Sequence, residues 1–212
     1  MKVVCTEPAA QAGHAPTEEF SGAGLTPYPE CPQRYDVVRA ALAPAAWADL
    51  MEPAAHSDEL LAAVHDADYL AFLQAAYTSW AANGGVGDLA ASVFATDAGR
   101  APANSAAATG FYGFDTTPIT AGTWAATRAA ADAALTAADF VLAGDAAAYA
   151  LCRPPGHHAS RRRFGGYCYL NHAALVAQRL SETGPVAMVD IDYHHGNGTQ
   201  QIFYERADVF FV

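Results

Sequence analysis

One segment of the sequence combines aspartate and histidine at a spacing that suits metal chemistry. In AMVDIDYHHGNGTQQIF, residues 187–203, Asp190, Asp192 and His194 lie two positions apart at the end of an apolar run. Side chains two apart on a strand share a face, so the three form one row with Asp190 set deepest. The outer pair, Asp192 and His194, offers a carboxylate and an imidazole, which a catalytic zinc accepts. The spacing therefore favours a metal site at the end of a strand.

Simpler explanations apply to the single residues of this region. A lone Asp or His at a strand end is usually a turn residue or a helix cap, which is the simplest interpretation of His195. Three polar residues on one face of a run as apolar as PVAMV are harder to explain in that way, because burying unpaired carboxylates is costly. Asn197 can direct its side-chain oxygen back toward the site. A second cluster, RPPGHHA, adds His157 and His158, which by themselves fit a solvated loop as well as a function.

The second half of the chain alternates strand-like apolar runs with helical patterns. The expected elements are a strand at 147–152, a loop at 153–170, a helix at 171–182, a strand at 185–192, a helix at 198–206 and a strand at 208–212. This order predicts an α/β fold in which a parallel β-sheet is flanked by helices on both faces. Such sheets bind ligands at the carboxyl ends of their strands, where both histidine clusters fall.

The first half shows fewer regular elements. The expected elements are a strand at 2–5, a loop at 6–30, a helix from Pro32, two helical pieces within 57–80 and an Ala-rich helix at 121–144 that ends at Gly144. Residues 81–120 lose periodicity, and a loop of that length is usually functional or disordered. A chain of 212 residues has room for one sizeable core, so we expect a single domain over 1–212.

Composition argues against several classes of function. With 52% hydrophobic and 16% charged residues, the chain is expected to be globular. Its formal charge of -11 argues against nucleic-acid binding, which needs Lys and Arg to neutralise phosphates, and suits a cationic substrate. No apolar run approaches the roughly 18 residues of a membrane span, and the N-terminus lacks a secretory pattern. We therefore expect a cytoplasmic protein with no membrane partner and with four reduced cysteines.

Six motifs, in order through nearly the whole chain, resemble the zinc-dependent histone deacetylases and the acetylpolyamine amidohydrolases. The motifs are ECPQR, VHDADYL, FYGFDTTP, RPPGHHA, FGGYCYLNHAA and VDIDYHHGNGTQQIFY. The HHGNGTQ and GFDTTPITAGTW segments are most similar to the acetylpolyamine amidohydrolase and bacterial class II deacetylase branch. The resemblance implies the arginase-deacetylase type of α/β fold and the hydrolysis of acetylated amines with release of acetate.

The resemblance also implies which residues bind metal ions. Asp192 and His194 match two of three ligands of a zinc ion, with Fe²⁺ as an alternative metal. A structural K⁺ site would use Asp190 and Asp192 together with the backbone of His194. A second K⁺ site would use backbone atoms near Phe203, Arg206 and Val209.

The catalytic histidines are assigned by the same resemblance. His158 matches the general base, which later acts as the acid, and His157 matches its electrostatic partner. Asp190 matches the residue that holds His157. Asn197 stands where many relatives have an Asp that holds His158, so we expect His158 to be less basic than in those relatives.

Three further positions match substrate-binding residues of the family. Tyr167 matches an aromatic wall of the acyl channel, and the Gly166 carbonyl matches an acceptor for the substrate amide. Asp115 matches an acidic rim residue that orients the substrate.

His56 and His65 are expected to be surface or packing residues, and His172 to start a helix. His14 is placed in a loop near the site, and Arg161–Arg163 in a solvated loop.

The third zinc ligand and an oxyanion tyrosine lie farther along the chain in relatives, and no residue up to Val212 matches either. A domain incomplete at its C-terminal side is therefore expected, with a complementing chain as the alternative.

The preferred substrate is an acetylpolyamine or a similar small cationic amide. The alternatives are acetyl-lysine in proteins and an inactive binding module. In the polyamine branch residues 81–120 would be acidic and would line a homodimer interface, and here Asp88, Asp97 and Asp115 leave the choice open.

Overall fold

The computed structural model describes residues 1–20, 22–96 and 99–212, so Asp97, one of the three acidic residues considered above, lies outside the described residues. The helices are α1 (Pro8–Ala12), α2 (Pro32–Leu42), α3 (Asp58–Ala62), α4 (Ala67–Ala82), α5 (Ser105–Tyr112), α6 (Thr123–Leu142), α7 (His172–Ser181) and α8 (Asn197–Phe203). The strands are β1 (Lys2–Val4), β2 (Glu18–Phe20), β3 (Leu25–Pro27), β4 (Asp49–Met51), β5 (Ala148–Ala150), β6 (Val186–Met188) and β7 (Val209–Phe211).

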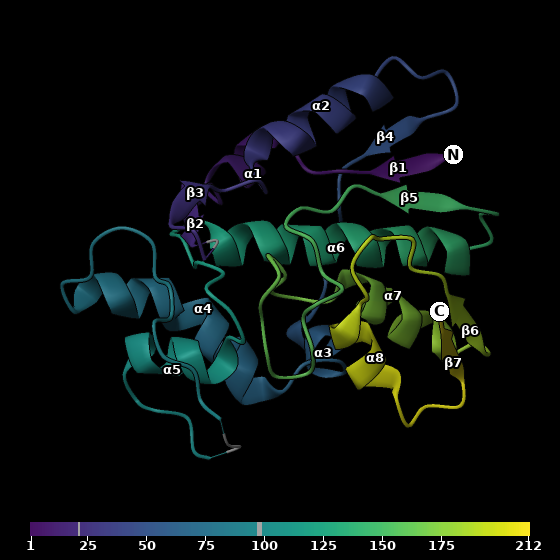
Figure 1. The fold of residues 1–212 in the computed structure, drawn as a ribbon. Coiled ribbons are helices and arrows are strands. Elements are labelled where there is room, and N and C mark those ends of the chain that lie inside the picture. Colours follow the sequence, from purple (N-terminus) through teal and green to yellow (C-terminus); the bar gives the residue numbers. More distant parts are fainter. Residues whose placement is uncertain (21, 97–98) are drawn as a thin grey trace.

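The fold contains parallel strands, as the sequence predicts. Strand β1 lies between β4 and β5 and pairs in parallel with both, while β6 and β7 form a second parallel pair. Helix α6 runs along one face of the β4-β1-β5 sheet and α2 lies on the other (Figure 1). The α/β class with helices on both faces is therefore confirmed. Across the described residues, none of the helices has the length and hydrophobicity that crossing a membrane would need.

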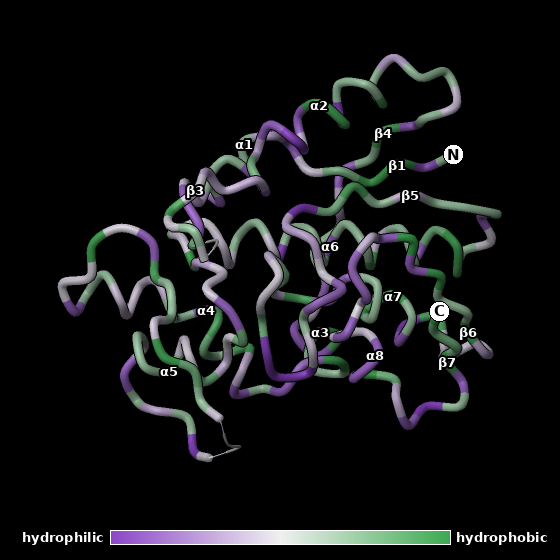
Figure 2. Tube along the Cα trace, viewed as in Figure 1, coloured by the Kyte–Doolittle hydropathy of each residue, from purple (hydrophilic) through white to green (hydrophobic). Residues whose placement is uncertain are grey.

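Helix α6 is the long internal support of the fold. Its alanines at helical spacing are almost fully buried, including Ala126, Ala130 and Ala134, and their small side chains let α7 and the sheet approach closely. Figure 2 shows hydrophobic residues along this helix and along α7. The helix ends at Leu142, and Gly144 follows the cap with a φ of 109°, a left-handed conformation that favours glycine.

Several elements differ from the sequence-based expectation. The loop expected at 6–30 contains α1 and the antiparallel β2–β3 hairpin, and α5 lies inside the segment 81–120 that shows no periodicity. Strand β4 was not expected, because three residues are too few to show a period of two. The strand expected at 185–192 is regular only over β6, although the backbone hydrogen bond from Asp190 N to Val212 O continues the ladder.

A buried ion pair ties the N-terminal loop to the end of β5. The Arg153 guanidinium donates to Glu30 Oε1 at 2.7 Å and to the backbone oxygens of Gln11 and His14 at 3.1 and 2.6 Å. The side chains of Arg153 and Glu30 are 4% and 2% exposed, so each charge depends on the other. This network fixes the start of the RPPGHH loop, which carries His157 and His158.

Replacing Arg153 with methionine is expected to lower the free energy of unfolding by about 3–5 kcal/mol, because the carboxylate of Glu30 stays buried without its cation. Denaturant unfolding followed by circular dichroism measures the loss. The double variant R153M/E30Q should recover part of it. Arg39→Met, which breaks the more exposed pair with Glu7, is the matched control and should cost less than about 1 kcal/mol. Equal losses of unfolding free energy in R153M and R39M would contradict the conclusion that burial makes the Arg153–Glu30 pair more costly to break.

Three histidines are packed in the interior and held by hydrogen bonds. His65 and His14 are fully buried and His172 is 5% exposed. His65 Nδ1 donates to Ser160 O at 2.9 Å, and its Nε2 accepts from the Asn171 backbone N–H at 3.0 Å. His65 is thus a packing residue and His172 begins α7, as expected.

Candidate active site

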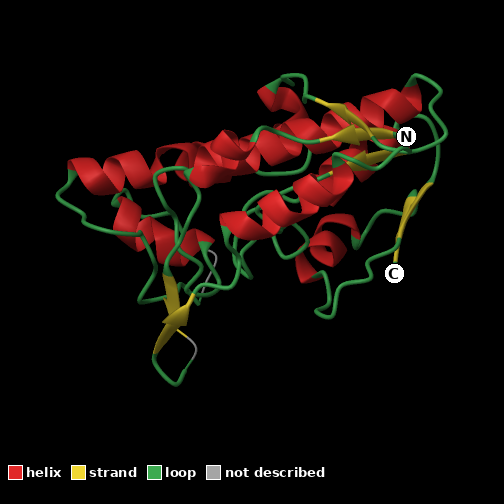
Figure 3. Cartoon of the chain, turned by 90° about the horizontal axis from the view of Figure 1, so that it is seen from above, coloured by secondary structure: helices red, strands yellow, loops and turns green. Residues whose placement is uncertain are grey.

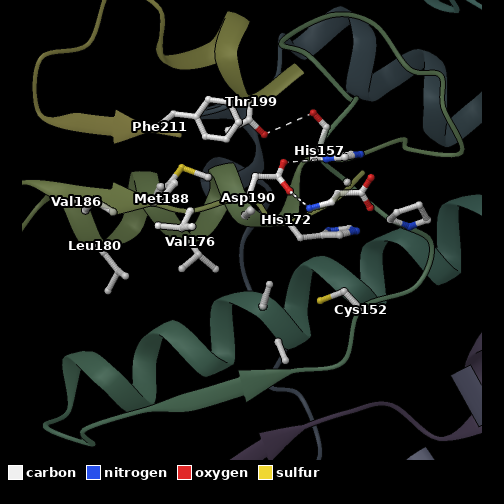
Figure 4. A pocket seen from close by; sticks show the side chains of 18 of the residues that line it. Cys152, His157, His172, Val176, Leu180, Val186, Met188, Asp190, Thr199 and Phe211 are labelled. Atoms are coloured by element: carbon white, nitrogen blue, oxygen red, sulfur yellow. Dashed lines mark hydrogen bonds and ion pairs between the residues drawn. The ribbon is translucent and has the colours of Figure 1, made fainter. Parts of the chain in front are cut away.

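The two histidine clusters meet where β5 and β6 end. The loop after β5 carries His157, and the segment after β6 carries Asp190, whose Oδ2 accepts a hydrogen bond from His157 Nδ1 at 2.8 Å (Figure 4). The backbone N–H of Thr199, in the first turn of α8, donates to the His157 carbonyl at 3.1 Å. Sequence reasoning did not single out Thr199, although it lies inside the HHGNGTQ motif. The ends of two separate strands and one helix therefore fix the first histidine.

His158 has an amide partner where His157 has a carboxylate. Its Nδ1 lies 2.6 Å from Asn197 Oδ1, and the centroids of the two histidine rings are 4.1 Å apart. An amide oxygen only accepts, so Nδ1 carries the proton and the neutral ring keeps a free lone pair on Nε2. Burial lowers the pKa of His158, and the nearby His157 and His194 lower it further, while the bond to Asn197 opposes this shift. A neutral imidazole at pH 7 can accept a proton.

Asp192 and His194 lie next to this pair, on the more exposed side. Asp192 Oδ1 is 3.6 Å from His194 Nδ1 and accepts the His194 backbone N–H at 2.8 Å, and this bond is the main reason why the pKa of Asp192 is lowered. The His194 ring centroid is 6.1 Å from that of His158. The structure thus brings the two expected ligands together within reach of the second histidine.

The donor set fits zinc in kind but not in number. An ionised carboxylate and an imidazole suit zinc, yet a catalytic site uses three protein ligands. Within residues 1–20, 22–96 and 99–212, no group of three or more His, Cys, Asp or Glu side chains is placed to hold one ion. For the potassium sites, Asp190 Oδ1 accepts the Asp192 backbone N–H at 3.2 Å, and the Phe203 carbonyl accepts the Arg206 N–H at 2.9 Å. Both sets of residues are therefore locally ordered.

The GGYCY segment packs directly against His158. A Cβ on Gly166 would lie 2.2 Å from Cδ2 of His158, so only glycine permits this approach. The Gly166 N–H donates to Asp115 Oδ2 at 2.6 Å, and the Tyr167 N–H donates to Thr117 Oγ1 at 3.1 Å. The structure thus places Gly166 against His158, with Tyr167 next to it in the chain, and Asp115 orders the backbone of this turn.

A cavity of about 540 Å³ opens between the strands that carry the two clusters. Its polar end is formed by His157, Asp190 and Asp192, and its apolar walls include Val176 of α7 and Met188 of β6 (Figure 4). Charged and polar groups that converge at one end of an apolar cavity are typical of a ligand site. The lining of this cavity does not include His158, Gly166, Tyr167 or Asp115, so it is not the expected acyl channel.

Comparison with known proteins agrees with this geometry. Residues 28–212 match the family described as "Histone deacetylase domain". The acetylpolyamine amidohydrolase of Mycoplana ramosa is 44% identical over 204 residues, which cover 94% of this chain and 60% of that protein. Acetylpolyamine amidohydrolase 1 of Pseudomonas aeruginosa is 44% identical over 206 residues, with the same coverage.

A solved structure extends the likeness to three dimensions. The crystal structure of acetylpolyamine aminohydrolase from Burkholderia pseudomallei, from an iodide soak, superposes with a TM-score of 0.90 at 38% identity. The comparison covers all of this chain and 62% of the other. The chain thus spans about 60% of the length of the curated relatives it matches. From the extent of these matches, and from the fold and motifs that they share, the protein belongs to the histone deacetylase family.

Proposed function

We propose that the protein hydrolyses the acetamide bond of small acetylated amines, releasing acetate and the free amine. The observation that carries the proposal is the pair of neighbouring histidines whose Nδ1 atoms both face oxygen acceptors, Asp190 at 2.8 Å and Asn197 at 2.6 Å. This arrangement leaves both Nε2 atoms available on the side of Asp192 and His194. The neutral imidazole of His158 can take a proton from a reacting water and return it, and the imidazole of His157, held by a carboxylate, lies beside it.

The residues of the chain would act in a defined order. His158 Nε2 removes the proton of the attacking water and later returns it to the leaving amine. His157, held by Asp190, stabilises the negative charge that develops at the reacting centre. A zinc ion bound through Asp192 and His194 would polarise the acetyl carbonyl and make the water more acidic. Tyr167 and the Gly166 carbonyl would hold the acyl arm in the channel.

Cationic substrates are favoured by the charges around the channel wall. Burial, followed by the hydrogen bond and charge of Glu19 and the charges of Asp115 and Glu30, raises the pKa of Tyr167. Glu19 and Asp115 are carboxylates that would attract the ammonium group of an acetylated polyamine. The charge of Glu30 is balanced by Arg153 and adds little to this attraction.

Arg161–Arg163 would repel a cationic substrate if they lay near the channel, but two of these three arginines are paired with carboxylates. Arg161 Nε lies 3.6 Å from Asp66 Oδ1, and Arg162 forms an ion pair with Asp68. Arg162 also lies over the ring of Phe111, 5.2 Å from its centroid. Two of the three positive charges of this loop are therefore balanced locally, which weakens the repulsion of a cationic substrate.

Acetate release from three matched substrates tests the proposal. We expect the zinc-loaded protein to hydrolyse a monoacetylated diamine about tenfold more efficiently than a neutral N-alkylacetamide of equal length, which corresponds to about 1.4 kcal/mol of charge attraction. An acetyl-lysine peptide is the third substrate. Treatment with a chelator should abolish turnover, and added Zn²⁺ should restore it. A preference for the peptide would favour a protein deacetylase, and no turnover of any substrate would reject the proposal.

A further inference from the structure

We propose that Glu19, on the β2–β3 hairpin, is a positioning residue that holds the Tyr167 ring at the acyl channel and thereby makes the hairpin part of the channel wall. The role in the channel rests on the function proposed above. The contact itself is a property of the fold and can be tested without turnover.

The backbone of Tyr167 needs external support. Its φ is 67°, in the left-handed region, and it directly follows two glycines that also have positive φ. A bulky aromatic residue rarely adopts this conformation, which persists only where neighbouring groups enforce it. The hydrogen bonds that the N–H groups of Gly166 and Tyr167 donate to Asp115 and Thr117 fix the main chain, but they leave the orientation of the ring to other contacts.

The ring is held from the hairpin. Its hydroxyl donates to Glu19 Oε2 at 2.6 Å, across 148 positions of the sequence. The edge of Tyr28, just after β3, packs against the same ring with centroids 4.9 Å apart and an interplanar angle of 74°. A hydrogen bond to a carboxylate is stronger and more directional than one to a neutral acceptor. Glu19 therefore sets where the phenol end of the ring lies, and Tyr28 limits its tilt.

The hairpin in turn depends on this contact. Each of its strands has three residues, and Phe20 and Leu25 are 60% and 68% exposed. A two-stranded hairpin with so little burial is marginally stable by itself. Figure 3 shows that it projects from the helical body of the molecule. At its base the Tyr28 N–H donates to Thr17 O at 3.0 Å, so the bond from Tyr167 to Glu19 adds an anchor farther along β2.

Four variants of the protein, as its cells produce it, separate positioning from charge. Glu19→Leu removes the acceptor, Glu19→Gln keeps an acceptor without the charge, and Tyr167→Phe removes the donor. Glu18→Gln is the matched control, because this exposed neighbour on β2 carries the same charge. We expect E19L and Y167F each to raise KM for the acetylated diamine about tenfold with little change in kcat. The double variant should be no worse than either single one. E19Q should raise KM for the diamine less than E19L does, because it loses the charge but keeps the acceptor, and E18Q should change KM less than twofold.

Hydrogen exchange of the backbone amides tests the contact between Glu19 and Tyr167 without any need for turnover. In E19L the backbone amides of Tyr167 and Cys168, far away in sequence, should exchange about tenfold faster than in the parent protein, as should those of the hairpin. E18Q should leave them unchanged. If this pattern appears without any hydrolysis, the positioning role stands and the proposed function fails. The inference is overturned if exchange at Tyr167 is the same in E19L and E18Q, or if the effects of E19L and Y167F on KM are additive.

Discussion

Replacing His158 with alanine is expected to lower kcat/KM for an acetylated diamine by about 10²–10⁴. The neutral ring donates from Nδ1 to Asn197 at 2.6 Å, so its Nε2 is free to accept a proton, and burial lowers its pKa, which keeps this form at pH 7. Alanine removes the base but leaves His157 and its bond to Asp190 in place. The loss should therefore fall mainly on kcat. Steady-state acetate release at saturating and at low substrate measures both constants.

The neighbouring His195 provides the control for this experiment. It is exposed, and its Nε2 lies 2.8 Å from Gln200 Oε1 on the first turns of α8. Its replacement by alanine should change kcat less than about threefold. A comparable loss in both variants, or a change in the circular dichroism spectrum of His158→Ala, would mean that the substitution disturbs the loop and would contradict its role as a base.

Acid is expected to unfold the protein steeply between pH 6.5 and 5. Burial lowers the pKa of His65 and His172 to about 4, and burial together with the charge of Arg153 lowers that of His14 to about 3. The unfolded chain binds these protons near pH 6.5, so between 6.5 and 4 it holds more protons than the folded chain. The free energy of unfolding then falls by about 2 kcal/mol per histidine at pH 5, or about 6 kcal/mol for the three.

The position of His14 refines this prediction. Its Nε2 lies only 3.6 Å from Glu30 Oε2, which suggests an ion pair, but desolvation and Arg153 keep the imidazole neutral. Denaturant titrations at pH 7.5, 6 and 5 measure the slope of stability with pH. His65→Gln should be less stable at pH 7.5 but should lose about one third of that slope. A stability that does not change between pH 7.5 and 5 would contradict the neutral burial of these rings.

The sequence predicted the elements that are long, show a regular hydrophobic period and have clear boundary residues. Helix α6 was predicted almost to the residue, because its alanines follow the helical period and Gly144 marks its end. The contact of His157 with Asp190 was implied by the resemblance to the deacetylase family, while the position of both clusters at strand ends followed from the alternating pattern. Asp192 and His194 were expected on a regular strand but lie beyond β6, although their side chains still meet. The site roles assigned to these residues stay predictions until activity is measured.

Contacts between distant segments could not be predicted from local patterns. Nothing in the residues around Glu19 indicates a bond to Tyr167, because periodicity reports only which face of an element is apolar. The three residues of β4 are too short to show a strand pattern, and its partner β1 lies more than forty positions away. His65 looked like an ordinary helix-flanking residue, yet its two ring nitrogens join the segments at Ser160 and Asn171.

The Arg153 network has a consequence for how the chain folds as it is made. Glu30 and the carbonyls of Gln11 and His14 receive their cation from a residue 123 to 142 positions farther along. On the ribosome, the N-terminal loop must therefore wait until Arg153 has been synthesised and has left the ribosome. Long-range closures of this kind slow folding and leave early segments exposed meanwhile. The first thirty residues are thus where a nascent chain of this protein would most need a chaperone.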